Sequence, residues 1–283
     1  MSKPLFSVLI AHYNNYQFFI DCYKSILSQT FQNFEVIILD DFSEEAQYNL
    51  LLELVKNDKR FKVYRNESNK GVGYTKRKLV ELANGKICGF VDPDDTIELQ
   101  AIEVMTNHHV NIPEASIINS NLNFCDKDLK PLKVSHVKQI KQKDPYFFNF
   151  NGNISHFTTF KKEFYNKTIG IDLYFRIAED QDLYLKLYEV GESIQIDDVL
   201  YNYRINPSSL TNSSKIEISK YWHWVAAIKA AERRSVNVEE LFVDNFVSKK
   251  DYDNISTKLE LLKKSRLLKL LNKLGLFKAY KHL

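Results

Sequence analysis

The stretch that decides the fold is Ile87-Cys88-Gly89-Phe90-Val91, followed directly by the turn Asp92-Pro93-Asp94-Asp95. The apolar run predicts a buried strand, and the strand ends at an acidic turn. Carboxylates this close raise each other's pKa unless a cation neutralises them, and a hard divalent ion with oxygen ligands does so. The alternative is a helix N-terminus, in which Asp94 and Asp95 interact with the dipole of a helix that begins near Thr96.

The chain before this stretch alternates short apolar runs with amphipathic segments. Strands are predicted at 7–10, 35–39, 62–64 and 87–91, and helices at about 16–29, 44–57 and 74–83. This βαβαβαβ order predicts a parallel, doubly wound α/β sheet.

Polar residues follow the last residue of three predicted strands, namely His12-Tyr13, Asp40-Asp41 and the turn at 92–95. In open α/β sheets, ligands bind outside the carboxyl ends of the strands. We therefore expect these three strand ends to converge on one crevice.

Five segments occur in an order that is specific to one family. They are Val8-Leu9-Ile10-Ala11-His12-Tyr13-Asn14, Ser25-Ile26-Leu27-Ser28-Gln29-Thr30, Glu35-Val36-Ile37-Ile38-Leu39-Asp40-Asp41-Phe42-Ser43, Lys76-Arg77-Lys78 and Asp92-Pro93-Asp94. In this order they resemble the family 2 glycosyltransferases of the bacterial surface-polysaccharide type, over roughly residues 5–210. The resemblance implies the GT-A fold, a Rossmann-like and mostly parallel sheet flanked by helices.

The resemblance also implies a site for a nucleotide-sugar donor, with a UDP-sugar expected first. Tyr13 matches the aromatic that stacks on the base, with the backbone at Ala11 beside it, where the family usually has Pro. Asp41 matches the carboxylate that accepts from the uracil imide N–H, and Arg77 matches the arginine that faces the nucleotide. From the residues alone, the alternatives are that Asp41 forms a turn and that Arg77 is a solvated cation on a helix.

A divalent metal, Mn or Mg, is the cofactor that the resemblance implies. Asp94 matches the main metal ligand and Asp92 the residue near the ribose and the metal. Asp95 is expected to support these two residues without binding the metal directly, or to cap a helix.

A second acidic cluster is Ala178-Glu179-Asp180-Gln181-Asp182-Leu183. It resembles the Glu-Asp motif of the family, which implies that Asp180 is the catalytic base. Inverting transfer needs one carboxylate that removes the proton of the acceptor hydroxyl as its oxygen attacks the anomeric carbon. The alternative is an acidic first turn on the helix predicted at about 178–190, which explains Glu179 or Asp182 equally well.

Two further matches are weaker. His156 falls in the acceptor-side strand of the family, and a structural histidine is at least as good an interpretation. Arg204 lies in a segment that resembles the family's Tyr-Arg-x-His, where it could reach the diphosphate. Asn206 replaces the family's histidine, which puts a metal or diphosphate role at that position in doubt.

Composition and length set the remaining expectations. With 44% hydrophobic and 27% charged residues, the chain is typical of soluble globular proteins, and a net charge of +3 gives no indication of a nucleic-acid partner. Three separated cysteines and the lack of a signal peptide or a membrane span predict a cytoplasmic protein. We expect a GT-A catalytic domain at 1–215, with a nucleotide-binding half at 1–125 and an acceptor half at 126–215. A helical C-terminal region is expected at 216–283.

Leucines in the C-terminal region recur near helical spacing, with lysines and arginines between them. The leucines are Leu259, Leu262, Leu267, Leu270, Leu271 and Leu274. A basic amphipathic helix of this kind can lie on the inner face of an anionic membrane, pack on the catalytic domain or pair two protomers into a homo-oligomer.

These features together predict an inverting, metal-dependent glycosyltransferase that extends a glycan or lipid-linked acceptor in surface-polysaccharide synthesis. A sugar nucleotidylyltransferase is the alternative reaction, but it would need a Gly-rich basic loop after the first strand, where Ala11-His12-Tyr13-Asn14-Asn15 stands. The third class is a non-catalytic nucleotide-sugar-binding module. Retention of Asp92, Asp94 and Asp180 argues against it.

Overall fold

The computed structural model describes residues 3–205, 216–245, 249–277 and 280, so Asn206 lies outside the described residues. The chain divides into two compact units, Met1–Ser235 and Val236–Leu283. The first unit contains the sheet and its covering helices, and the second unit is helical where it is described.

The first half of the sheet is parallel, as the sequence predicts. Its order is β3 (Phe61–Arg65), β2 (Phe34–Asp40), β1 (Phe6–His12) and β4 (Ile87–Phe90). β1 and β2 pair in register from Phe6 with Phe34 to His12 with Asp40. Both strands are almost entirely buried, which is why they appear in the sequence as unbroken apolar runs.

Beyond β4 the sheet becomes mixed. β8 (Thr158–Lys161) is antiparallel to both β4 and β6 (Ala115–Cys125), and β9 (Glu192–Arg204) runs parallel to β6. β7 (Pro131–Ser135) pairs with β6. β5 (Thr96–Ile97) pairs with β9, so Thr96 begins a short strand where the sequence suggested a helix.

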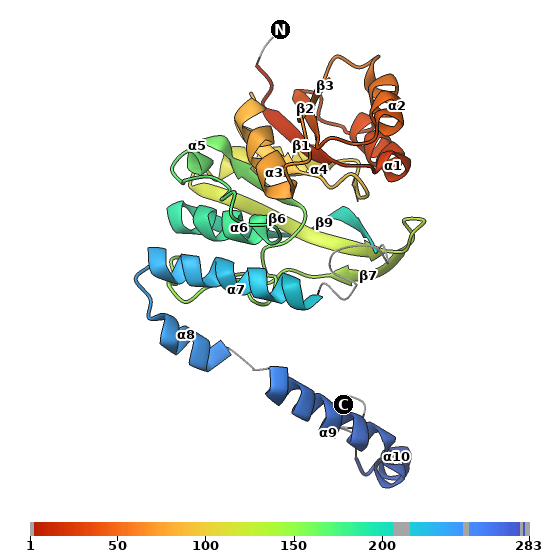
Figure 1. Cartoon of the computed structure of the whole chain (residues 1–283), viewed down its shortest axis with the longest axis vertical. Coiled ribbons are helices and arrows are strands. Elements are labelled where there is room, and N and C mark those ends of the chain that lie inside the picture. The colour runs from red at the N-terminus through yellow and green to blue at the C-terminus, as the bar shows by residue number, and fades with distance from the viewer. Residues whose placement is uncertain (1–2, 206–215, 246–248, 278–279, 281–283) are drawn as a thin grey trace. The chain divides into compact units, whose positions relative to one another are not determined.

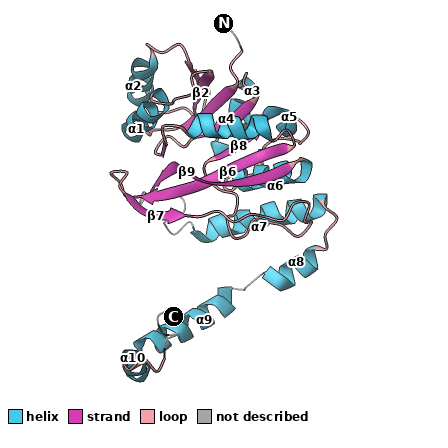
Figure 2. Ribbon diagram, turned by 180° about the vertical axis from the view of Figure 1, so that it is seen from behind, coloured by secondary structure: helices cyan, strands magenta, loops and turns pink. Residues whose placement is uncertain are grey.

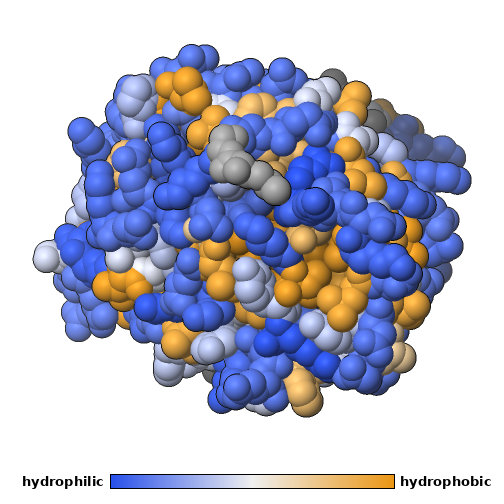
Figure 3. Space-filling model, turned by 90° about the horizontal axis from the view of Figure 1, so that it is seen from above, coloured by the Kyte–Doolittle hydropathy of each residue, from blue (hydrophilic) through white to orange (hydrophobic). Residues whose placement is uncertain are grey.

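Helices cover both faces of the sheet (Figures 1 and 2). Successive side chains of a strand point to opposite faces, so each face has its own core. One core contains apolar side chains of α1 (Tyr16–Leu27), α2 (Glu45–Val55) and α4 (Ala101–Asn111). The other contains those of α3 (Val72–Leu82), α5 (Lys162–Tyr165) and α6 (Glu179–Val190). The face shown in Figure 3 is mostly hydrophilic, with smaller hydrophobic areas between the hydrophilic ones.

Helix α7 (Ile216–Arg233) belongs to the first unit. Three ion pairs connect this helix and Arg234, which follows it, to the segment around α6. Lys229 pairs with Asp172, and both Arg233 and Arg234 pair with Glu189. The division in the structure therefore follows α7, whereas the boundary expected from the sequence, 215/216, precedes it.

The second unit contains α8 (Val238–Asn245), α9 (Lys249–Lys264) and α10 (Arg266–Lys273). Ser265 caps α10 by accepting a hydrogen bond from the backbone N–H of Leu268. Throughout the described residues, every helix is too short or too polar to span a membrane.

Candidate active site

The ends of β1 and β2 place Tyr13 and Asp41 side by side. His12 is opposite Asp40 in the register, and the backbone N–H of Asp41 donates to the carbonyl of His12 at 2.8 Å. The Tyr13 side chain is 51% exposed, which leaves its ring free to stack on a planar ligand.

His12 and Asp40, the residues just before Tyr13 and Asp41, have a structural role. His12 Nδ1 lies 2.9 Å from Asp40 Oδ1, and both side chains are fully buried. Burial acts to raise the pKa of Asp40, but hydrogen bonds from His12 and Ser43 outweigh it and hold the pKa below its ordinary value. His12 and Asp40 are therefore engaged with each other, and Tyr13 is the exposed side chain at these two strand ends.

Asp41 is held in place by the loop that precedes α3. Its carboxylate accepts from Asn66 Nδ2, the backbone N–H of Lys70 and the backbone N–H of Gly71, each at 2.8 Å. Gly71 has φ of +87°, a conformation that residues with a Cβ rarely adopt. This glycine allows the loop to turn toward the carboxylate.

The three carboxylates of the acidic turn have different environments. Asp95 is buried, and it accepts from the Tyr201 hydroxyl and from the backbone N–H of Arg204, both at 2.8 Å. Burial, and then the charges of Asp92 and Asp94, raise the pKa of Asp95 well above its ordinary value. Asp95 thus fastens the turn to β9 and caps no helix.

Asp92 and Asp94 are the partly exposed carboxylates of this turn. Burial, and then the charge of Asp92, raise the pKa of Asp94 to about 6. Two carboxylates that oppose each other's ionisation are stabilised by a bound cation. Among the described residues, no group of three or more His, Cys, Asp or Glu side chains is arranged to hold a metal.

Arg204 lies at the turn, but its guanidinium has protein partners. Nε donates to the carbonyl of Asp94 at 2.7 Å, one Nη donates to the carbonyl of Lys127 at 2.6 Å, and the other donates to Asp21 at 2.9 Å. Arg204 therefore holds the backbone of the turn with three of its five side-chain N–H donors, and its contact with a diphosphate stays a prediction.

His156 also lies at the turn. Its Nε2 is 3.9 Å from Asp92 Oδ2, and its ring stacks on Tyr201 with 5.1 Å between ring centroids. His156 thus packs on Tyr201, as a structural histidine would, and it also lies beside the acidic turn.

Asp180 lies in the first turn of α6, where its Oδ1 accepts from the backbone N–H of Gln181 at 2.7 Å. Burial acts to raise its pKa, but the positive charge of Lys76, followed by that of His156, outweighs burial and holds the pKa below its ordinary value. The carboxylate is therefore ionised at neutral pH and can accept a proton.

Lys76 is a site residue that the sequence interpretation did not select. It is buried, and its Nζ lies 2.7 Å from Glu179 Oε1. Burial acts to lower its pKa, but the charges of Glu179, Asp92 and Asp180 outweigh burial and raise the pKa well above its ordinary value. Lys76 thus links the acidic turn to the Glu-Asp motif.

Arg77, the predicted donor-facing cation, points elsewhere. It donates to the carbonyl of Ile171 at 3.0 Å, lies 3.5 Å from Glu81, and is 38% exposed. Helical spacing contained the signal for Lys76, because Lys76 lies three and four residues before the buried Leu79 and Val80. Lys76 also lies three residues after the buried Gly73, which places it near the centre of the buried face, whereas Arg77 lies at the margin of that face.

The matched family is described as glycosyl transferase family 2, and its model covers residues 7–169, more than half of the chain. A chondroitin synthase of Escherichia coli is 28% identical over 234 residues, which are 82% of this chain and 33% of that synthase. The chain thus spans about a third of the length of this relative.

Two solved structures show the same fold. One is Staphylococcus aureus TarS 1-349 in complex with UDP-GlcNAc, with a TM-score of 0.62 and 20% identity over 79% of this chain and 66% of that chain. The other is the mannosyltransferase PcManGT of Pyrobaculum calidifontis with GDP-Man and Mn²⁺, with a TM-score of 0.63 and 14% identity over 100% of this chain and 83% of that chain. At these identities the likeness concerns the fold alone.

Proposed function

The chain belongs to glycosyl transferase family 2 and is a glycosyltransferase of the GT-A type, and from this membership we propose that it is an inverting, metal-dependent enzyme. It transfers a sugar from a nucleotide donor, UDP-linked first, to a glycan or lipid-linked acceptor. The observation that carries the proposal is the position of Lys76, whose charge interacts with both Asp92 and Asp180. We propose on this basis that the acidic turn and the Glu-Asp motif form one site.

The donor base is proposed to bind between Tyr13 and Asp41. Tyr13 offers an exposed ring, and a carboxylate has about four acceptor positions. Three of these positions on Asp41 are taken by Asn66, Lys70 and Gly71, which leaves one for the imide N–H of uracil.

Asp92 and Asp94 are proposed to hold Mn²⁺ or Mg²⁺. The pKa of Asp94, raised to about 6 by burial and by Asp92, is the feature of this structure that fits a cation between them. Mg²⁺ commonly takes one or two protein carboxylates and completes its shell with phosphates and water. Such an ion stabilises the negative charge of the departing diphosphate.

Asp180 is proposed to act as general base. Its carboxylate takes the proton of the acceptor hydroxyl while the hydroxyl oxygen bonds to the anomeric carbon, and the bond from that carbon to the diphosphate breaks. Attack opposite the leaving group inverts the anomeric configuration. Lys76 keeps Asp180 ionised, which the base must be before it can accept the proton.

The proposed acceptor is a growing polysaccharide. This rests on the name of the relative, a chondroitin synthase. UDP is the first nucleotide to test because TarS forms a complex with UDP-GlcNAc. Mn²⁺ is the first metal to test because the PcManGT complex contains it.

Helix α10 is proposed to contact an anionic membrane surface, which would bring the enzyme to lipid-linked acceptors. Leu267, Leu270 and Leu274 are 64%, 53% and 61% exposed and lie on one helix face. Lys269 and Lys273 occur among them and would meet anionic headgroups.

A donor screen tests the proposed reaction. UDP-, GDP- and dTDP-sugars are incubated with the full chain and a mixture of acceptors, with Mn²⁺ or with EDTA, and the released nucleotide is quantified. We expect UDP release that EDTA abolishes. Full activity in EDTA would contradict the metal role, and donor binding without transfer or hydrolysis under any condition would contradict catalysis.

A further inference from the structure

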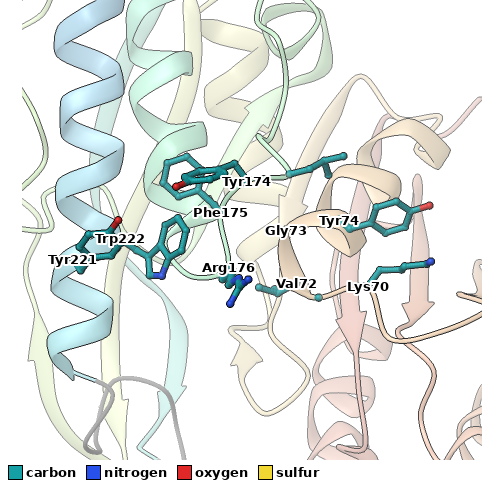
Figure 4. A pocket seen from close by; sticks show the side chains of 11 residues that line it. Lys70, Val72, Gly73, Tyr74, Tyr174, Phe175, Arg176, Tyr221 and Trp222 are labelled. Atoms are coloured by element: carbon teal, nitrogen blue, oxygen red, sulfur yellow. The ribbon is translucent and has the colours of Figure 1, made fainter.

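A pocket of about 700 Å³ lies beside the site and has no part in the mechanism above. One wall is the loop and first turn of α3, from Lys70 to Tyr74. The other wall combines the segment 173–176, before α6, with Tyr221 and Trp222 of α7 (Figure 4).

The pocket shares its wall with both halves of the proposed site. Gly71, in the first wall, donates its backbone N–H to Asp41. A Cβ at Gly73 would lie 2.9 Å from the carbonyl oxygen of Phe175 and 3.7 Å from Glu179 Cβ. The two walls therefore meet at Gly73, next to the residue that precedes Asp180.

Aromatic rings give the pocket surfaces on which sugar rings can stack. Trp222 contacts Tyr174, Phe175 and Tyr221, with 5.4, 5.6 and 5.5 Å between ring centroids. Tyr174 and Tyr221 remain 58% and 57% exposed. Aromatic side chains with an apolar face and a polar edge suit the alternating C–H and hydroxyl surfaces of a glycan.

The charged lining residues of the pocket are both cations, Lys70 and Arg176. Arg176 lies between Trp222 and Val72 in the view of Figure 4. The nearby Asp172 is paired with Lys229 at 2.5 Å and so adds no net negative charge. A guanidinium fork binds carboxylate and phosphate oxygens in pairs.

We infer that this pocket is an acceptor subsite for an acidic glycan, one that carries carboxylate or phosphate groups. The inference rests on the proposed transfer reaction and names its acceptor class. The donor's diphosphate is anionic too, but Asp92 and Asp94, where it is expected, are not among the residues that line this pocket.

Binding of three oligosaccharides to the full chain tests the inference in the absence of donor. The probes are a hexasaccharide of alternating glucuronate and N-acetylglucosamine, a glycerol-phosphate hexamer, and a neutral hexasaccharide of N-acetylglucosamine. We expect at least one acidic probe to bind more tightly than the neutral one. Which of the two binds identifies carboxylate or phosphate as the group recognised.

Matched variants locate the binding. Arg176→Gln is expected to weaken acidic-probe binding roughly ten- to a hundredfold, since hydrogen bonds to charged groups contribute at this level. Tyr174→Ala should weaken it as well, while Lys138→Gln, an exposed cation outside the pocket lining, should not. Arg176→Lys is expected to retain part of the affinity.

Nucleotide release without acceptor separates this inference from the proposed function. Arg176→Gln should hydrolyse the donor like the unsubstituted chain while losing acidic-probe binding. Equal binding of neutral and acidic probes, no binding of any probe, or unchanged binding in Arg176→Gln would overturn the subsite. None of these three results would affect the donor-side proposal, which is tested separately by nucleotide release with Mn²⁺ and with EDTA.

Discussion

At the scale of single residues, Asp180 is the carboxylate whose ionisation the site supports. Asp180→Asn keeps the shape of the side chain and removes its basicity, so we expect transfer to fall by about 10²–10⁴-fold. Binding of UDP, measured by calorimetry with Mn²⁺, should change little. Asp198→Asn, an exposed carboxylate on β9, is the matched control. Undiminished transfer in the Asp180 variant would exclude this residue as the base.

Lys76 and Arg77 are neighbours with opposite environments, which makes them a matched pair. Lys76→Met leaves Glu179 buried without its cation, and breaking a buried pair costs about 3–5 kcal/mol. We expect lower unfolding free energy and lower transfer in Lys76→Met, and near-normal values in Arg77→Met. Urea unfolding and UDP release measure the two effects, and Lys76→Arg should recover stability. A larger activity loss in Arg77→Met would restore the assignment made from the sequence.

The pH dependence of kcat/KM also tests the effect of the Lys76 charge on Asp180. The pKa of Asp180 lies below its ordinary value because Lys76 and His156 favour the ionised form over the opposing effect of burial. Activity that depends on ionised Asp180 is present above this pKa and is lost as the pH falls through it. Removing the positive charge in Lys76→Met raises the pKa, so the acid limb of kcat/KM should move to higher pH. A limb that stays in place would show that Lys76 does not control this group.

At the scale of elements, α10 is amphipathic and exposes its leucines. Leu267→Glu combined with Leu270→Glu removes exposed apolar area and adds charge of the same sign as the headgroups. We expect the double variant to lose co-sedimentation with vesicles that contain anionic lipid, and the unsubstituted chain to bind less at high salt. Leu132→Glu, on the exposed strand β7, is the control. Equal sedimentation of all three proteins would contradict a membrane role for α10.

At the scale of the whole molecule, the first unit extends through α7. A chain that ends at residue 235 keeps the ion pairs of α7 and its flank with Asp172 and Glu189. We expect it to unfold cooperatively and to release UDP from the donor. A chain that ends at 215 lacks α7, whose Ala226, Ala227 and Ala230 are buried in the structure. It therefore exposes the apolar surface on which these alanines pack, and it should have a lower Tm. Equal Tm values would support the boundary at 215/216 instead.

The sequence by itself determined the fold and where its buried parallel strands lie. Apolar runs such as 35–39 and 87–91 predict buried strands because burial on both faces leaves no polar positions. Parallel strands align their carboxyl ends, which predicts that Tyr13, Asp41 and the turn at 92–95 converge. The strand predictions are confirmed because each depends on a local pattern, while the convergence of the three strand ends on one crevice stays a prediction.

Only the tertiary structure decided which charged groups face one another. Lys76 and Glu179 are 103 positions apart in the sequence, and Asp95 and Tyr201 are 106 positions apart. In the structure, the side chains of each pair form a hydrogen bond. The spacing of apolar residues in a helix predicts that a side chain is buried. It does not identify the oppositely charged or hydrogen-bonding group that a buried charge needs. That is why the sequence separates Asp95 from Asp92 and Asp94 but does not identify Tyr201 as its partner, and why it does not select Lys76.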